Sequence, residues 1–85
     1  MKILDLPLKK EWYNAIEKGD KNEEYREIKP YWEKRLIAKG YTHVRFRYGY
    51  TKRCMTFPIE LIARGVGKPE WGAPTEYVFI IKFKK

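Results

Sequence analysis

The stretch GDKNEEYR, residues 19–26, joins a predicted helix to a predicted strand. Gly19 suits the left-handed conformation that ends many helices. In the extended segment that follows, side chains alternate between two faces, so Glu24 and Arg26 share a face and Lys21 lies just before them. Charged groups of mixed sign are costly in a purely apolar core. The spacing therefore predicts a polar cleft in which these three side chains pair with one another.

Outward from this stretch, hydrophobic periodicity predicts seven elements in the order β-α-β-α-β-β-β. The predicted strands cover residues 2–6, 22–28, 44–48, 55–62 and 76–84, and the predicted helices cover residues 8–18 and 30–39. Pro7 is expected to open the first helix and Gly40 to close the second. Pro58 predicts a strand that lies at a sheet edge or is bulged there. Many short strands with few helices favour an α+β fold with a curled or closed sheet.

The length of 85 residues predicts one domain, residues 1–85. The net charge is +8, from 19 Lys and Arg against 11 Asp and Glu, and a field of that sign attracts polyanions such as nucleic acid. The alternative is that the lysines only keep a small protein in solution. With one cysteine, Cys54, and one histidine, His43, the chain can form neither an intramolecular disulfide nor a Cys-based zinc site. No metal and no cofactor is expected.

The sequence lacks a long apolar run, so no membrane span and no membrane partner is expected. Residues 1–8 do not have the apolar segment of a signal peptide. A lone cysteine fits a reducing compartment. These features together favour a cytoplasmic location.

The pattern Gly-x-Lys-x-x-Glu-x-Arg, met at Gly19, Lys21, Glu24 and Arg26, resembles the signature of the ASCH domain family. The order of the elements around it is similar as well, so the resemblance covers nearly the whole chain. It implies a PUA-like β-barrel of about five to six strands with two short helices. It also implies that the motif residues line a cleft between barrel and helix, and that the domain binds RNA or a modified nucleoside or nucleotide.

The resemblance leaves an enzymatic alternative open, because some relatives are amidohydrolases of acylated cytidine and others have been assigned ribonuclease activity. Lys21, with a lowered pKa, could then serve as base, and Glu24 as acid or base. In the amidohydrolase subgroup a nucleophilic threonine stands where this chain has Glu24, so the same mechanism is not expected here. Two further alternatives are a protein-interaction domain and, for the three motif side chains, a solvated ladder of ion pairs.

Other aromatic and basic side chains are weaker candidates. Arg45 and Arg47 share a strand face and could contact phosphates, or could lie on an ordinary solvated face. Tyr50, in a predicted turn, could stack on a base or pack across the hairpin. Trp71, in the Gly/Pro-rich loop 65–74, could cover a ligand or plug the barrel. The predicted ligand-binding residues are Lys21, Glu24, Arg26, Tyr31, Arg45, Arg47, Tyr50 and Trp71.

Three further expectations concern packing. Trp12 and Trp32 are predicted to lie in the core, because each recurs with apolar neighbours at helical spacing. Tyr31 points elsewhere and is expected to flank the cleft. Cys54 is expected to behave as a small apolar residue.

Overall fold

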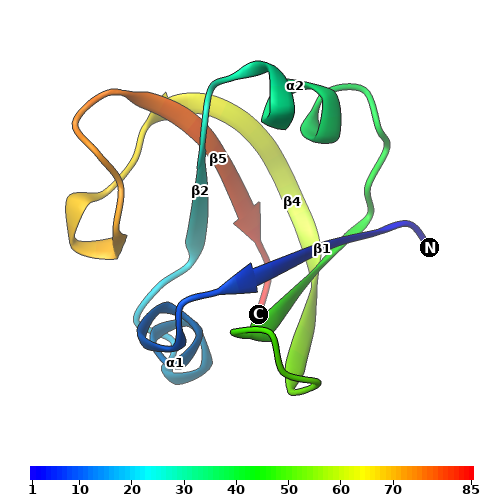
Figure 1. Ribbon diagram of the computed structural model, residues 1–85, viewed down its shortest axis with the longest axis vertical. Helices are drawn as coiled ribbons and strands as arrows, with labels where there is room; N and C mark the ends of the chain where they lie inside the picture. The colour runs from blue at the N-terminus through cyan, green and yellow to red at the C-terminus, as the bar shows by residue number, and fades with distance from the viewer.

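The computed structural model describes residues 1–85 and has the predicted order of two helices and five strands (Figure 1). The strands are β1 (Ile3–Leu8), β2 (Glu23–Glu27), β3 (His43–Tyr48), β4 (Cys54–Val66) and β5 (Tyr77–Phe83). The helices are α1 (Lys10–Lys18) and α2 (Pro30–Leu36), and a single 3₁₀ turn, Pro69–Trp71, interrupts the connection between β4 and β5. Neither helix combines the length and the apolar character that crossing a membrane requires.

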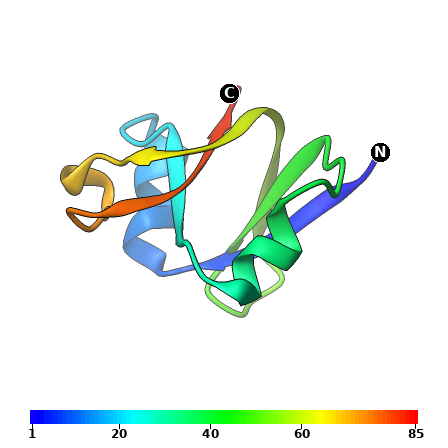
Figure 2. The same cartoon turned by 90° about the horizontal axis from the view of Figure 1, so that it is seen from above.

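All five strands belong to one sheet in the order β1-β3-β4-β5-β2, which curls into a half-barrel (Figures 1 and 2). β1 runs parallel to β3, and the other neighbours are antiparallel. The long strand β4 pairs with β3 through its first part and with β5 through its second, so it joins the two halves of the curl. β1 and β2 remain as the two edges. We call the place where these edges approach each other the seam.

A bulge in β4 between Ile59 and Leu61 produces much of this curl, because an extra residue bends and twists a strand. The bulge also changes which side chains face inward. Leu61, which a strict two-residue repeat would place on the same face as Met55, Phe57 and Ile59, is exposed, and Ile62 is half-buried instead. Of the two alternatives for Pro58, the bulge next to it is confirmed and the edge position is wrong, because β4 has a partner strand on each side.

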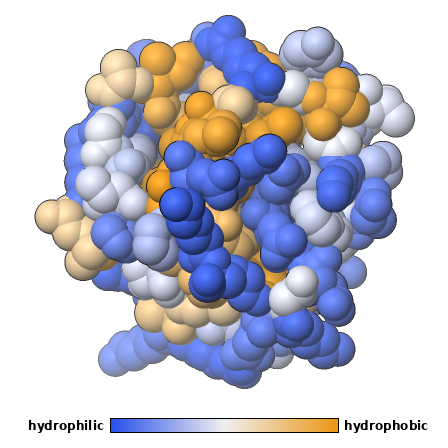
Figure 3. Space-filling view, turned by 180° about the vertical axis from the view of Figure 1, so that it is seen from behind, coloured by the Kyte–Doolittle hydropathy of each residue, from blue (hydrophilic) through white to orange (hydrophobic).

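The main core lies inside the curl, between α1 and the inner faces of the strands. It comprises Leu4, Leu6, Leu8, Tyr13, Ile16, Leu36, Val44, Phe46, Phe79, Ile81 and Phe83. The core residues of α1 are therefore Tyr13 and Ile16, whereas Trp12 and Trp32, predicted to be core, are only half-buried. Cys54 is exposed, which contradicts its expected apolar role. On the face behind that of Figure 1, hydrophilic residues interrupt the apolar surface (Figure 3).

Both helices are shorter than predicted. Pro7 and Leu8 continue β1 instead of opening α1, which begins at Lys10. An edge strand tolerates proline because one row of its N–H groups has no partner strand. α2 ends at Leu36 rather than at residue 39, and Ile37 already has an extended backbone and an exposed side chain. A helix of only seven residues has few internal hydrogen bonds to hold a further turn.

Candidate functional site

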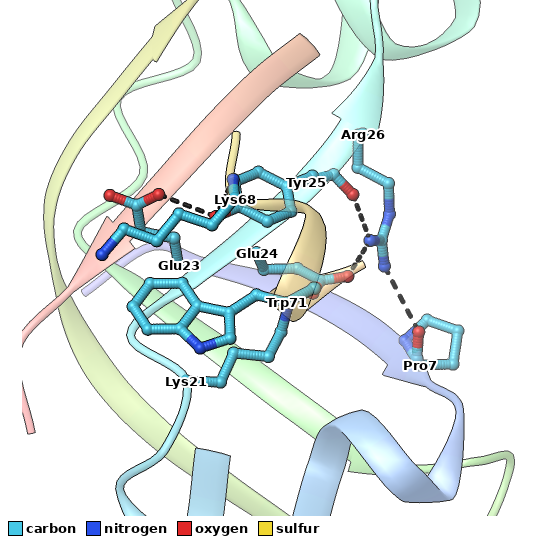
Figure 4. A network of polar contacts seen from close by, with 8 residues as sticks. All are labelled: Pro7, Lys21, Glu23, Glu24, Tyr25, Arg26, Lys68 and Trp71. Carbon is cyan, nitrogen blue, oxygen red and sulfur yellow. Dashed lines mark hydrogen bonds and ion pairs between the residues drawn. The ribbon is translucent and has the colours of Figure 1, made fainter. Parts of the chain in front are cut away.

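Lys21, Glu24 and Arg26, three of the charged residues in the stretch 19–26, meet at the seam (Figure 4). Glu24 and Arg26 share a face of β2, as the two-residue repeat predicts, and Lys21 precedes the strand. One carboxylate oxygen of Glu24 lies 3.1 Å from the ammonium of Lys21, and the other accepts a hydrogen bond from Arg26. We call these three residues the seam trio. Their predicted pairing is confirmed.

Lys21 is the most enclosed member, with 1% of its surface exposed. Its ammonium donates to the main-chain carbonyl of Trp71 and lies 4.9 Å and 4.8 Å from the ring centroids of Trp12 and Tyr25. Burial lowers the pKa of Lys21, and the charge of Glu24 opposes this shift. The ammonium thus supports the carboxylate from inside the protein, and a direct role of Lys21 toward a ligand stays a prediction.

Arg26 is the member that reaches the surface. One terminal nitrogen, Nη1, donates to Glu24 and to the carbonyl of Tyr25, and the other, Nη2, donates to the carbonyl of Pro7 at 3.3 Å. The last bond links the two open edges of the sheet, β2 and β1. The guanidinium also stacks on Trp32, with 5.2 Å between Cζ and the ring centroid. Since a guanidinium has five N–H donors, two of them, on Nε and Nη2, are left over.

Two hollows adjoin Arg26. The outer hollow has a volume of about 470 Å³ and lies between β2, Trp32 and the loop at Ala73 and Pro74. The seam hollow has a volume of about 290 Å³ and lies between the end of β1 and β2. Both are lined by Tyr25, Arg26 and Gly72, so the two hollows are neighbours and Arg26 borders each of them. The outer hollow has the size of small-molecule sites, which begin at about 300 Å³.

The loop after β4 can cover the seam trio because two of its residues lack a side chain. A Cβ at Gly67 would lie 2.6 Å from the Tyr25 ring, and one at Gly72 would lie 2.9 Å from the Trp12 ring. Gly72 also has a φ of 95°, which disfavours any other residue. These close approaches bring the carbonyl of Trp71 to Lys21.

Tyr25 connects this loop to β2 through its hydroxyl. The hydroxyl donates to the Glu23 carboxylate at 2.8 Å and accepts from the main-chain N–H of Lys68 at 3.1 Å. Burial raises the pKa of Tyr25. The Trp71 ring lies under the Lys68 ammonium and packs against the small cluster around Tyr25, which fits the plug alternative better than the lid.

Four of the predicted residues lie outside the seam. Arg45 and Arg47 share a face of β3, as expected, but both pair with Asp5, at 3.3 Å and 2.8 Å. Tyr31 is exposed, packs edge-on against Trp32 and lines neither hollow. Tyr50 is 94% exposed, so the alternative that it packs across the hairpin is wrong.

Several residues of the site are not predicted by sequence patterns. Trp12, Tyr25 and Trp32 surround the cations of the seam trio, and the carbonyls of Pro7 and Trp71 accept their hydrogen bonds. A partial signal was available, because Tyr25 lies inside the motif and Trp71 lies in the Gly/Pro-rich loop. The carbonyl partners cannot be predicted from residue type, because every residue has a main-chain carbonyl.

Comparisons of the chain with protein-family models, with curated proteins and with solved structures find no match. The ASCH resemblance therefore stays a prediction. What the seam binds must be inferred from its own residues.

Proposed function

We propose that the chain is an RNA- or nucleotide-binding module of the PUA-like, ASCH type, and that the ligand occupies the hollows on either side of Arg26. The observation that carries this proposal is how that guanidinium is held and which of its N–H donors are unused. Three hydrogen bonds and the Trp32 ring hold it in place, and two N–H donors remain beside the hollows. A planar fork of this kind matches the oxygens of a phosphate.

The charges of the seam trio support an anionic ligand. Two cations surround one carboxylate, so the trio keeps one net positive charge at the seam. Because Glu24 and two carbonyls already fix Arg26, little conformational entropy is lost when it binds. Lys21 and Glu24 act as positioning residues in this arrangement, and Arg26 makes the contact with phosphate.

The outer hollow suits a base. Trp32, Pro74 and Val78 provide apolar walls, and the carboxylates of Glu27 and Glu76 also line it. Carboxylates accept hydrogen bonds from exocyclic amines such as that of cytosine. A nucleotide with its base in the outer hollow and its phosphate at Arg26 would be complementary to the hollow and to the guanidinium.

The hydrolase alternative fits the geometry less well. Its base would be Lys21 or Glu24. The Lys21 ammonium faces Glu24, the Trp71 carbonyl and two rings, and Lys21 lines neither hollow. Glu24 lines the seam hollow, but both of its carboxylate oxygens are already paired. Incubation with acylated cytidine and with short RNA should therefore give no product. The protein-interaction alternative is also less favoured, since hydrophilic residues interrupt the apolar surface on the face seen in Figure 3.

The test is a titration with RNA and with nucleoside monophosphates, followed by tryptophan fluorescence, because Trp12 and Trp32 line the hollows. Arg26→Ala should weaken binding about tenfold or more, since hydrogen bonds to charged groups contribute about 1.5–3 kcal/mol. Arg26→Lys keeps the charge but loses the fork, so it should fall between wild type and Arg26→Ala.

Arg64→Ala is the matched control, because it removes an arginine that is half exposed and lines neither hollow. Its affinity should stay within about twofold of wild type, as expected for a surface charge. Equal losses in Arg26→Ala and Arg64→Ala, with both variants folded by circular dichroism, would refute the proposed site. Absence of binding by the wild type would refute the function.

A further inference from the structure

A third hollow, of about 290 Å³, lies beside the turn between β3 and β4, and we call it the hairpin hollow. It shares Pro7, Leu8 and Lys9 with the seam hollow. Since the seam hollow in turn shares residues with the outer hollow, the three hollows lie in a row across the seam, and we call this row the groove. Arg26 borders the outer hollow and the seam hollow.

The hairpin hollow is lined by an exposed ring and by two lysines that form no ion pair. Tyr50 is 94% exposed and contacts neither another ring nor a cation. Lys9 and Lys10 also line this hollow, and neither takes part in an ion pair. The Lys10 ammonium lies over the Tyr48 ring, 5.2 Å from its centroid, whereas Lys9 has no such contact. An exposed ring next to two ammonium groups that no carboxylate neutralises offers a base-stacking face beside phosphate-binding charges.

The sign of the charge also changes along the groove. Carboxylates line the outer hollow, at Glu27 and Glu76. Towards the hairpin the groove becomes cationic, at Arg26, Lys9 and Lys10, and the one carboxylate there, Glu24, is already paired twice. A ligand that is complementary to these charges has a base at the outer end and a chain of phosphates that extends towards the hairpin.

We propose that the hairpin hollow is a second nucleotide subsite, so that the ligand is single-stranded RNA of at least two nucleotides rather than a free mononucleotide. This inference rests on the function proposed above. One base occupies the outer hollow, the phosphates follow Arg26 and Lys9, and the next base stacks on Tyr50. The affinity of this stack does not depend strongly on sequence, since every base has a π-face.

The test compares a nucleoside monophosphate, a dinucleotide and a hexanucleotide of the same base. Wild type should bind the dinucleotide and the hexanucleotide more tightly than the monophosphate. Tyr50→Ala should weaken both longer ligands about tenfold and leave the monophosphate unchanged, because stacking on an aromatic ring is lost. Tyr77→Ala, which removes another exposed tyrosine that lines no hollow, should change none of the three affinities.

A second measurement uses salt. For the hexanucleotide, the double variant Lys9→Ala/Lys10→Ala should reduce the slope of log K against log salt by about 1.4, or about 0.7 per lysine. An unchanged slope would show that no phosphate binds to Lys9 or Lys10, and would contradict the second subsite.

The outcomes separate the two proposals. If wild type binds the monophosphate as tightly as the hexanucleotide, or if Tyr50→Ala behaves like Tyr77→Ala, the second subsite is refuted and the function proposed above stands. Equally tight binding of a polyphosphate of matched charge would also refute a subsite based on stacking. If no nucleotide of any length binds, both proposals fail.

Discussion

Two clusters in this molecule have the same arrangement of charges and different surroundings. The seam trio consists of Lys21, Glu24 and Arg26, and a second group, the strand trio, consists of Asp5, Arg45 and Arg47. In each, one carboxylate lies between two cations. Side-chain exposure is at most 16% in the seam trio and at least 32% in the strand trio. The two differ in their access to water.

Access to water decides what each cluster can do. Water and salt screen the strand trio, so its ion pairs contribute little, although Arg47 donates two hydrogen bonds of 2.8 Å to Asp5. In the seam trio each charge depends on the others and on carbonyls from β1 and the loop after β4. The fold therefore fixes the orientation of Arg26 through three different partners, whereas Arg45 and Arg47 donate only to Asp5. A preorganised charge is the better basis for specific binding.

The largest expected effect comes from removal of the two carboxylates. Glu24→Ala leaves two cations enclosed without their counter-charge, which should lower the free energy of unfolding by about 3–5 kcal/mol. Asp5→Ala leaves two arginines in contact with water and should cost at most about 1 kcal/mol. Urea denaturation of both variants measures the difference.

Glu24→Gln is the control for shape, because it keeps the side-chain volume and one acceptor oxygen while removing the charge. Its free energy of unfolding should fall between those of wild type and Glu24→Ala. If Glu24→Ala and Asp5→Ala were destabilised equally, burial would not distinguish the two trios.

A smaller effect should come from the hydroxyl that joins the seam to its covering loop. Tyr25→Phe leaves the Lys68 N–H without its acceptor and should cost about 1–2 kcal/mol at neutral pH. The effect of this substitution on stability should also depend on pH. Because burial raises the pKa of Tyr25 above its ordinary value of 10.0, the folded state retains the proton, and this stability is lost as pH rises above 10.

The difference between wild type and Tyr25→Phe should therefore narrow between about pH 8 and about pH 11. Unfolding free energies at the two pH values measure it. Tyr77→Phe, at an exposed position, is the matched control and should show no difference at either pH. A constant gap for Tyr25→Phe would show that the hydroxyl is not buried as described.

The same contrast explains which features the sequence predicts. The end of α1 at Gly19 and the shared face of Glu24 and Arg26 follow from local conformation and the two-residue repeat, and both are found. The order of the elements is also predicted, because hydrophobic periodicity is local. The pairing of the seam trio could thus be expected before its surroundings were known.

The enclosure of the trio could not be predicted in this way. The carbonyl that receives the Lys21 ammonium belongs to Trp71, 50 residues further along the chain, and main-chain carbonyls carry no sequence signal. The prediction for Pro7 is wrong for a related reason. Proline suits both the first turn of a helix and an edge strand, and only the position of β1 in the sheet decides between them.

The smallest expected effect concerns the strand trio in acid. The hydrogen bond from Arg47, together with Arg45, lowers the pKa of Asp5 below its ordinary value of 3.8. The stability gained from the ionised carboxylate is therefore present above pH 3.8 and is lost as pH falls through the lower, folded value. Because the groups contact water, high salt should reduce this gain even at neutral pH. Unfolding free energies of wild type and Asp5→Asn, measured from about pH 5 down to about pH 2.5 in low and high salt, should converge in acid and in salt. If the difference between them persisted in about 1 M salt, the strand trio would be as well shielded as the seam trio, and exposure would not separate a structural charge cluster from a binding one.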